Sequence, residues 1–224
     1  MIILSTHLDD AVFSCYSLLT PQTTVLTVFA GVPPPGTLGS WDAQDPSVDD
    51  SHTRMLQRRE EDRQALARSG AQALHLDLLE SQYAHVCQPA DQKTIVSAIA
   101  PVLSRTDQVV APAGFGNPEH AFVRDAVLRL RPACDFYADL PFAKNDNCRP
   151  PSGMPAAGKS RSVRLEGDLL AQKLASCLEY KSQVPQLRRL LGDFFDAEHL
   201  GREVLWQRVP GSCAGGGPRI ALDS

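Results

Sequence analysis

The stretch MIILSTHLDDAVFS, residues 1–14, decides the fold and contains the first cluster of polar residues that suggests chemistry. An apolar run over 1–4 predicts a buried strand over 2–6, and a helical apolar pattern resumes over 11–19. His7, Asp9 and Asp10 fall between these two elements. In an open parallel sheet, ligands bind where strands end and helices begin. We therefore expect these three side chains to lie at the functional edge of such a sheet.

Segments with strand and helix patterns alternate along the rest of the chain. Strands are expected at 2–6, 23–29, 73–79, 108–112 and 134–140, and helices at 11–19, 52–69, 91–103, 118–130 and 167–182. This alternation is typical of parallel strands joined by right-handed crossovers. We predict one α/β domain over 1–210, with a Rossmann-like, mostly parallel sheet flanked by helices, and a flexible tail over 211–224.

Composition excludes several classes of protein. With 43% hydrophobic and 21% charged residues, the 224-residue chain has the make-up of an ordinary globular domain. A net charge of −4 argues against a nucleic-acid partner. We see neither an apolar run long enough to span a membrane nor a signal-peptide pattern. Six cysteines without a CxxC pair indicate free thiols, so we expect a cytoplasmic protein, either a monomer or a homo-oligomer.

A second polar turn, APAGFGNPEH at 111–120, follows the fourth predicted strand and contains Asn117, Glu119 and His120. If the two polar turns meet, they offer imidazole, carboxylate and imidazole, which suit a divalent transition metal such as zinc. A spare carboxylate beside the metal could take a proton from water. An alternative stays open, because Asp9 or Asp10 could simply cap the helix that begins near residue 11.

Motifs in these turns resemble those of a known family. HLDDAVFS at 7–14 resembles the HPDDE motif of the LmbE-like, or PIG-L, family of zinc-dependent de-N-acetylases, and NPEH at 117–120 stands where that family has HPDH. Further segments similar to family motifs follow in order: VLTVFAG at 25–31, RREEDRQALARSGA at 58–71, HLDLLESQY at 75–83 and YKSQ at 180–183. The ordered set covers most of residues 1–183 and is more specific than any single match.

The resemblance implies a metal site and a base. His7, Asp10 and His120 would bind Zn²⁺, although Fe²⁺ would also accept this ligand set. Asp9 would act as the general base that deprotonates the attacking water and later protonates the leaving amine.

The resemblance also implies two substrate contacts. Arg58 falls on the family's substrate-contacting arginine, and Glu80 falls where an acid meets a sugar hydroxyl. The alternative for these two is a solvated helix face and a polar strand end. We expect Glu61 to form an i, i+3 ion pair that orients Arg58, and Trp41 to anchor its loop to the core. Asp139, at the end of the fifth strand, could contact substrate.

The sequence departs from the family pattern at three positions. Leu8 replaces the proline of HPDDE and Ala11 its glutamate, and neither position is expected to bind metal. Asn117 replaces the first histidine of HPDH, which would stabilise the oxyanion of the tetrahedral intermediate. An amide N–H can still donate a hydrogen bond there, but it cannot supply a proton. Alternatively, Asn117 is a turn residue before Pro118.

Together with these features, the resemblance implies a zinc-dependent enzyme that hydrolyses an N-acetyl (N-acyl) group from an amino sugar or aminoglycosylated small molecule, as in the biosynthesis of a secondary metabolite such as an antibiotic. Loops 32–51 and 142–165 would form a lid over the site. Two alternatives remain. The chain could be a ligand-binding homologue that lost turnover at Asn117, or a metal-dependent amidase whose substrate is not a sugar.

Overall fold

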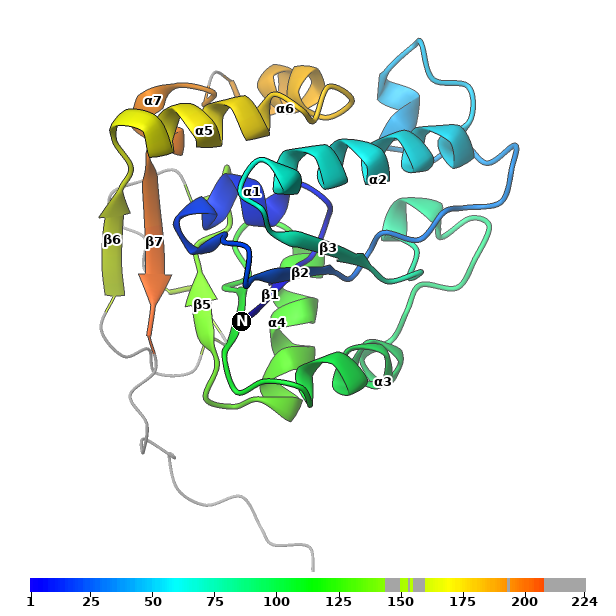
Figure 1. Cartoon of the computed structure of the whole chain (residues 1–224). Helices are drawn as coiled ribbons and strands as arrows, with labels where there is room; N and C mark the ends of the chain where they lie inside the picture. Colours follow the sequence, from blue (N-terminus) through cyan, green and yellow to red (C-terminus); the bar gives the residue numbers. More distant parts are fainter. Residues whose placement is uncertain (144–149, 153, 155–159, 193, 208–224) are drawn as a thin grey trace, which may run out of the picture.

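The chain folds around a seven-stranded sheet with the strand order β3-β2-β1-β4-β5-β7-β6 (Figure 1). This architecture comes from a computed structural model, which describes residues 1–143, 150–152, 154, 160–192 and 194–207. The strands are β1 (Ile2–Ser5), β2 (Thr24–Thr27), β3 (Gln72–His75), β4 (Val109–Pro112), β5 (Asp135–Tyr137), β6 (Ser160–Arg164) and β7 (Arg202–Trp206). The first five strands run parallel, and β7 is antiparallel to both β5 and β6. The predicted α/β fold with a mostly parallel sheet is therefore confirmed.

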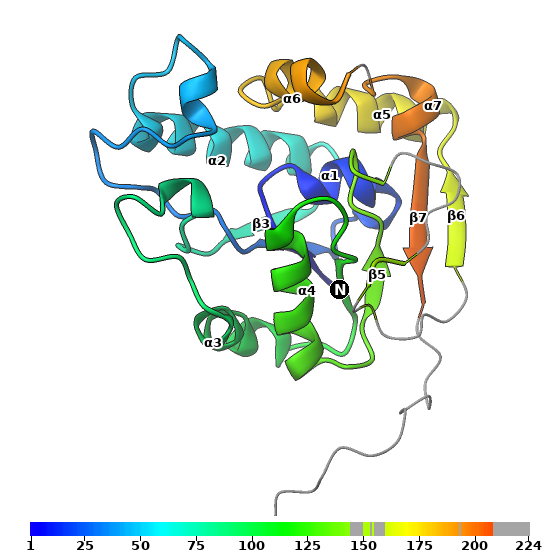
Figure 2. The ribbon, with the colours of Figure 1, turned by 180° about the vertical axis from the view of Figure 1, so that it is seen from behind.

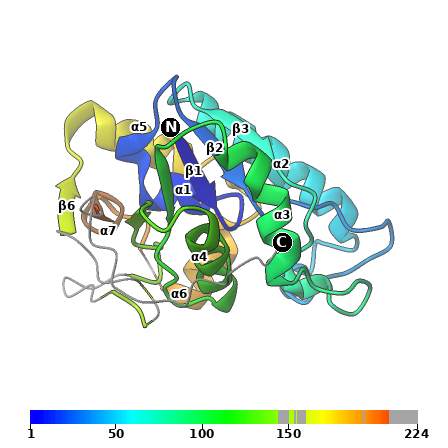
Figure 3. The ribbon, with the colours of Figure 1, turned by 90° about the horizontal axis from the view of Figure 1, so that it is seen from below.

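Helices cover both faces of the sheet (Figures 1 and 2). On one face lie α1 (Asp10–Ser14), α2 (Ser51–Ala67), α5 (Gly167–Cys177) and α6 (Val184–Leu191), and on the other α3 (Gln92–Leu103) and α4 (Pro118–Leu130). Figure 3 views the face that α3 and α4 cover. Shorter elements are α7 (Ala197–Leu200) and the 3-10 turns η1 (Tyr16–Leu18), η2 (Asp42–Gln44) and η3 (Ser81–Tyr83). Among the described residues, no helix is both long and apolar enough to cross a membrane.

Strand β1 is the centre of the molecule. All four of its residues are buried, as expected of a parallel strand with helices on both faces. Ile3 packs into the core beneath α1, α2 and α5, whereas Ile2 and Leu4 pack into the core beneath α3 and α4. The strand therefore joins two hydrophobic cores, and the polar residues that follow it emerge at the end of the sheet.

Several predicted elements have different boundaries. The helix expected over 11–19 is broken at Cys15 into α1 and η1, and the helix expected over 167–182 ends at Cys177. Within 142–165, expected as a loop, the structure contains β6. Its sequence, SRSVR, is mostly exposed and carries no apolar alternation, so only its pairing with β7 makes it a strand. The tail expected over 211–224 lies outside the described residues.

A buried ion pair ties α5 to the antiparallel edge of the sheet. Lys173 and Glu203 are both fully buried, with 2.7 Å between Nζ and Oε1. The other Glu203 oxygen accepts the backbone N–H of Ser17 at 3.1 Å, so this carboxylate also holds η1.

Replacing Lys173 by Met would leave the Glu203 carboxylate buried without its partner charge. We expect the free energy of unfolding to fall by about 3–5 kcal/mol, as measured by urea denaturation. Lys181→Met is the matched control, because Lys181 is 73% exposed and lies 3.9 Å from Glu179. That exposed pair is expected to contribute less than about 1 kcal/mol. Equal losses in the two variants would show that burial of the first pair is energetically unimportant.

Candidate metal centre and substrate pocket

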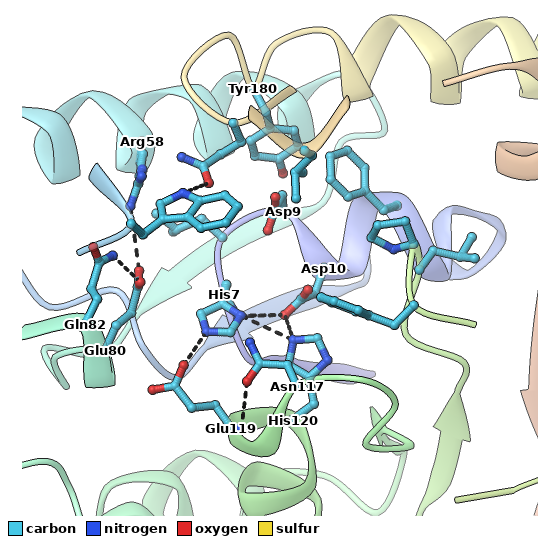
Figure 4. Close-up of a pocket in the computed structure, with 18 of the residues that line it drawn as sticks. His7, Asp9, Asp10, Arg58, Glu80, Gln82, Asn117, Glu119, His120 and Tyr180 are labelled. Carbon is cyan, nitrogen blue, oxygen red and sulfur yellow. Dashed lines mark hydrogen bonds and ion pairs between the residues drawn. The ribbon is translucent and has the colours of Figure 1, made fainter. Parts of the chain in front are cut away.

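Two turns bring three possible metal ligands together (Figure 4). His7 follows β1, Asp10 begins α1, and His120 lies in the first turn of α4. His7 Nδ1 lies 3.2 Å from His120 Nε2. Asp10 Oδ2 lies 3.3 Å from that His120 nitrogen and 3.5 Å from His7 Nδ1. The two turns meet because β1 and β4 are neighbouring parallel strands.

This triangle has the dimensions of a zinc site. Around a tetrahedral Zn²⁺ with bonds of about 2.0–2.1 Å, neighbouring ligand atoms lie about 3.3 Å apart. The three atom-to-atom distances, 3.2, 3.3 and 3.5 Å, bracket that value. The donors, two imidazoles and a carboxylate, are those that zinc prefers, and Fe²⁺ would accept them too. The cluster therefore fits the expected Zn²⁺ cofactor.

The carboxylate and the imidazoles of the cluster stabilise each other's charged forms. Burial alone would lower the pKa of His120, but the Asp10 carboxylate outweighs it and raises this pKa to about 9. Burial would raise the pKa of Asp10, and the two imidazoles reverse that effect and lower it. The cluster therefore favours positive charge at the point where the three side chains meet. A divalent cation would supply that charge and would displace protons from the ligand atoms.

Each histidine also meets a carboxylate at its far nitrogen. His7 Nε2 lies 2.9 Å from Glu119 Oε2, and His120 Nδ1 lies 2.9 Å from Asp139 Oδ1. Such outer carboxylates hold the proton on the far nitrogen and leave the near nitrogen free to bind metal. Asp139 is wholly buried behind His120, where its other oxygen accepts the N–H groups of Gly114 and Phe115. The expectation that Asp139 contacts substrate is therefore wrong.

The turn after β1 is closed by buried polar groups. The Ser5 hydroxyl donates to the carbonyl of His7 and accepts the N–H of Ala11. Asp10 accepts the backbone N–H of His7 at 2.7 Å through Oδ2, the same oxygen that faces the two imidazoles. These bonds fix the turn and hold the Asp10 carboxylate toward the cluster.

Asp9 is the N-cap residue of α1 by position, but within the described chain its carboxylate accepts no capping hydrogen bond. The alternative that Asp9 caps this helix is therefore wrong. Its carboxylate points instead into the cavity, between Asp10 and Tyr180 (Figure 4). Burial, followed by the negative charge of Asp10, raises the pKa of Asp9 to about 7. A group with such a pKa can both accept and return a proton near neutral pH.

Asn117 caps α4. Its side-chain oxygen accepts the N–H of Glu119 at 2.9 Å. Asn117 therefore has a structural role in the turn before α4, as the turn-residue alternative expects. Because the oxygen faces the helix, the amide nitrogen faces the opposite way, toward the cavity that Asn117 also lines (Figure 4). The cap thus leaves an N–H donor available for a ligand.

Arg58 lies in a buried ion pair with Asp42, and its other terminal nitrogen lies 3.9 Å from Glu80 Oε1. The second Asp42 oxygen accepts the hydroxyls of Ser51 and Tyr83. Sequence reasoning missed Asp42, because a single acid in a loop rich in Gly, Pro and Asp carries no periodic signal. The loop 32–51, which we expect to form part of a lid, is held to α2 through Asp42.

Glu61 does not serve as the partner that orients Arg58, which corrects the expected i, i+3 pair. Its carboxylate accepts both the N–H and the hydroxyl of Ser182. Its neighbour Asp62 accepts the Tyr180 hydroxyl at 2.8 Å. The charged run RREEDR is thus partly buried against the YKSQ segment, because these partners satisfy its carboxylates.

Trp41 anchors its loop, as expected. Its indole N–H donates to Gln183 at 3.2 Å, and its carbonyl accepts the side-chain N–H of Gln186 at 2.7 Å. The indole also lines the cavity. Trp41 therefore fixes one wall of the cavity as well as the path of the loop.

All seven predicted site residues line one cavity of about 230 Å³. They are His7, Asp9, Asp10, Arg58, Glu80, Asn117 and His120. Other side chains add an apolar surface, and Phe142 packs edge-on against His120 with 5.5 Å between ring centroids. Peptide bond 140–141, which precedes a proline on this wall, is cis. The cavity thus combines a candidate metal site with polar and apolar walls, as ligand pockets commonly do.

Removing one imidazole should abolish metal binding. We expect one zinc per chain in the unaltered protein and almost none in His120→Ala, measured by elemental analysis after dialysis. His199→Ala is the control, because His199 is 38% exposed and contacts Asp196, away from the cluster. Zinc retained by His120→Ala would show that the ion binds elsewhere.

Comparison with known proteins places this site in a structural context. No family model and no curated protein matches the chain. Among solved structures, a triple mutant of the deacetylase Orf2 of the teicoplanin biosynthetic pathway is 26% identical, with a TM-score of 0.74 over 94% of this chain and 99% of that one. The zinc-inhibited form of Orf2 is 24% identical, with a TM-score of 0.73 over 94% and 99% of the two chains.

Two further deacetylases share the fold. Dbv21, the deacetylase of the antimicrobial A40926 pseudoaglycone, is 25% identical, with a TM-score of 0.73 over 93% of this chain and 96% of that one. N,N'-diacetylchitobiose deacetylase from Pyrococcus horikoshii is 14% identical, with a TM-score of 0.59 over 87% and 74%. The chain shares the fold of these deacetylases, and the order of its motifs resembles that of the LmbE-like, or PIG-L, family of de-N-acetylases.

Proposed function

We propose that this protein is a zinc-dependent hydrolase that removes the N-acetyl group from an amino sugar carried by a small molecule, in secondary metabolism. The observation that carries the proposal is the triangle of His7, Asp10 and His120, open to a cavity that Asp9 also lines. The similarity to two deacetylases of antibiotic pathways, at 25–26% identity over nearly the whole chain, supports it.

The reaction needs an activated water, a base and a group that stabilises negative charge. A divalent cation held by His7, Asp10 and His120 would polarise the amide carbonyl and lower the pKa of water to about 7. Asp9 takes the proton from the attacking water as the new C–O bond forms. It returns that proton to the amine nitrogen as the C–N bond breaks, so that acetate and a free amine leave.

Asn117 supplies the hydrogen bond to the developing oxyanion. Its amide nitrogen faces the cavity because its oxygen is held by the N-terminus of α4. A donor that is already oriented stabilises the transition state without reorganisation. This assignment favours a working asparagine over the alternative of a ligand-binding homologue that lost turnover.

Glu80 and Arg58 would recognise the sugar. Glu80 lines the cavity, and burial raises its pKa despite the nearby positive charges. Arg58 is held by Asp42 and is largely buried, so it acts mainly by orienting Glu80. A carboxylate oriented in this way can accept hydrogen bonds from vicinal hydroxyls, which favours a sugar over a substrate without hydroxyls.

We place this activity in the cytoplasm, because Cys15 and Cys177 are buried thiols rather than halves of a disulfide.

The direct test is acetate release by zinc-loaded protein from a panel of N-acetylhexosamine conjugates, with N-acetylated amino acids and peptides as the alternative substrates. We expect release from the sugars, and a loss of about 10²–10⁴-fold in Asp9→Asn with zinc content unchanged. Hydrolysis of the amino-acid amides alone would point to the non-sugar amidase. Ligand binding without acetate release in any case would favour the non-catalytic homologue.

Asn117→Asp separates the two roles of this residue. The aspartate keeps the oxygen that caps α4 but has no N–H donor, so the free energy of unfolding should change little. We expect kcat to fall by about 10²–10³-fold, the usual effect of removing one oxyanion donor. Thermal unfolding and steady-state kinetics on the same preparation check both outcomes. An unchanged kcat would leave Asn117 as a helix cap only.

A further inference from the structure

We infer that Glu119 is a positioning residue that couples the metal site to the turn that carries Glu80. Metal binding at His7 therefore restrains the side of the cavity on which Glu80 lies. The inference rests on the proposed function only in treating Glu80 as a residue that contacts the substrate. The coupling itself is a property of the contacts and can be measured without a substrate.

Glu119 uses its two carboxylate oxygens on two different parts of the fold. Oε2 lies 2.9 Å from Nε2 of His7, the nitrogen on the far side of the ring from the candidate metal. Oε1 accepts the backbone N–H of Ser81 at 2.7 Å. The residue itself lies in the first turn of α4, directly before His120. One side chain therefore contacts a metal ligand, adjoins a second in sequence, and holds the start of η3.

The turn that Glu119 holds contains Glu80, which lines the cavity between Arg58 and Gln82 (Figure 4). Ser81 is exposed, and its backbone N–H is held by Glu119. The bond from Glu119 is therefore well placed to decide how rigidly the Glu80 carboxylate is presented to a ligand.

A cation would strengthen this link. With His7 Nδ1 bound to metal, the ring proton must lie on Nε2, where it donates to Glu119 Oε2. That bond fixes the Glu119 side chain, and its other oxygen then holds the Ser81 N–H more persistently. By linkage, a ligand that holds the turn strengthens metal binding by the same factor.

The other outer carboxylate provides a matched control. Asp139 Oδ1 lies 2.9 Å from the far nitrogen of His120, the same distance as Glu119 from that of His7, but its second oxygen holds Gly114 and Phe115 rather than the 80–82 turn. A variant at Asp139 should therefore weaken metal binding without disconnecting the turn.

The experiment measures hydrogen exchange of the Ser81 amide with and without zinc, and zinc affinity by competition with a chelator. In the unaltered protein, saturating zinc should slow Ser81 exchange by about 5-fold or more. Glu119→Gln keeps an oxygen for Ser81 but places an amide N–H₂ against His7 Nε2. This variant should bind zinc about 10–100-fold more weakly. At saturating zinc its Ser81 amide should exchange as it does without metal.

Asp139→Asn should also bind zinc more weakly, yet its Ser81 amide should still slow once zinc saturates. Glu119→Asp, one methylene too short to span both partners, is the second variant and should behave like Glu119→Gln. The same zinc response at Ser81 in both Glu119 variants as in the unaltered protein would overturn the inference. So would Ser81 exchange that is insensitive to zinc in the unaltered protein. These outcomes do not depend on acetate release, so they are distinguishable from failure of the proposed function.

Discussion

The site depends on the parallel pairing of β1 with β4 at the centre of the sheet. Because parallel neighbours end at the same edge, the turns after these strands meet, and residues more than a hundred positions apart become neighbours. His7 and His120 come within 3.2 Å by this route. The apolar residues of β1 are buried on both faces, so the position of His7 is set by the hydrophobic core rather than by a flexible loop. A metal site built on such elements is preorganised.

A second constraint is the buried charged face of α2. Arg58, Glu61 and Asp62 point inward and meet partners from the loop before the helix and from the segment after α5. Buried charges are costly unless they are paired and hydrogen-bonded. The partners Asp42, Ser182 and Tyr180 meet that requirement, and Tyr180 also lines the cavity. The RREED and YKSQ motifs therefore form one set of contacts between α2 and the segment after α5.

The sequence was sufficient to predict the parallel sheet and the convergence of two polar turns, because apolar periodicity and the carboxyl-edge rule act on local patterns. It was insufficient for β6, whose exposed sequence becomes a strand only by pairing with β7. It also failed for Glu61, because spacing along a helix allowed a pair with Arg58 while a distant serine offered better hydrogen bonds. Asp42 and the buried position of Asp139 depend on tertiary contacts that have no signature in the nearby residues.

The helix cap at Asn117 has one more consequence. A histidine at this position would change its charge with the acidity of the surroundings, and its usefulness as a donor would change with it. A carboxamide neither gains nor loses a proton under physiological conditions. Here its oxygen accepts the N–H of Glu119 at the start of α4, which keeps the amide from flipping. The ability of Asn117 to donate a hydrogen bond is therefore independent of pH over the physiological range.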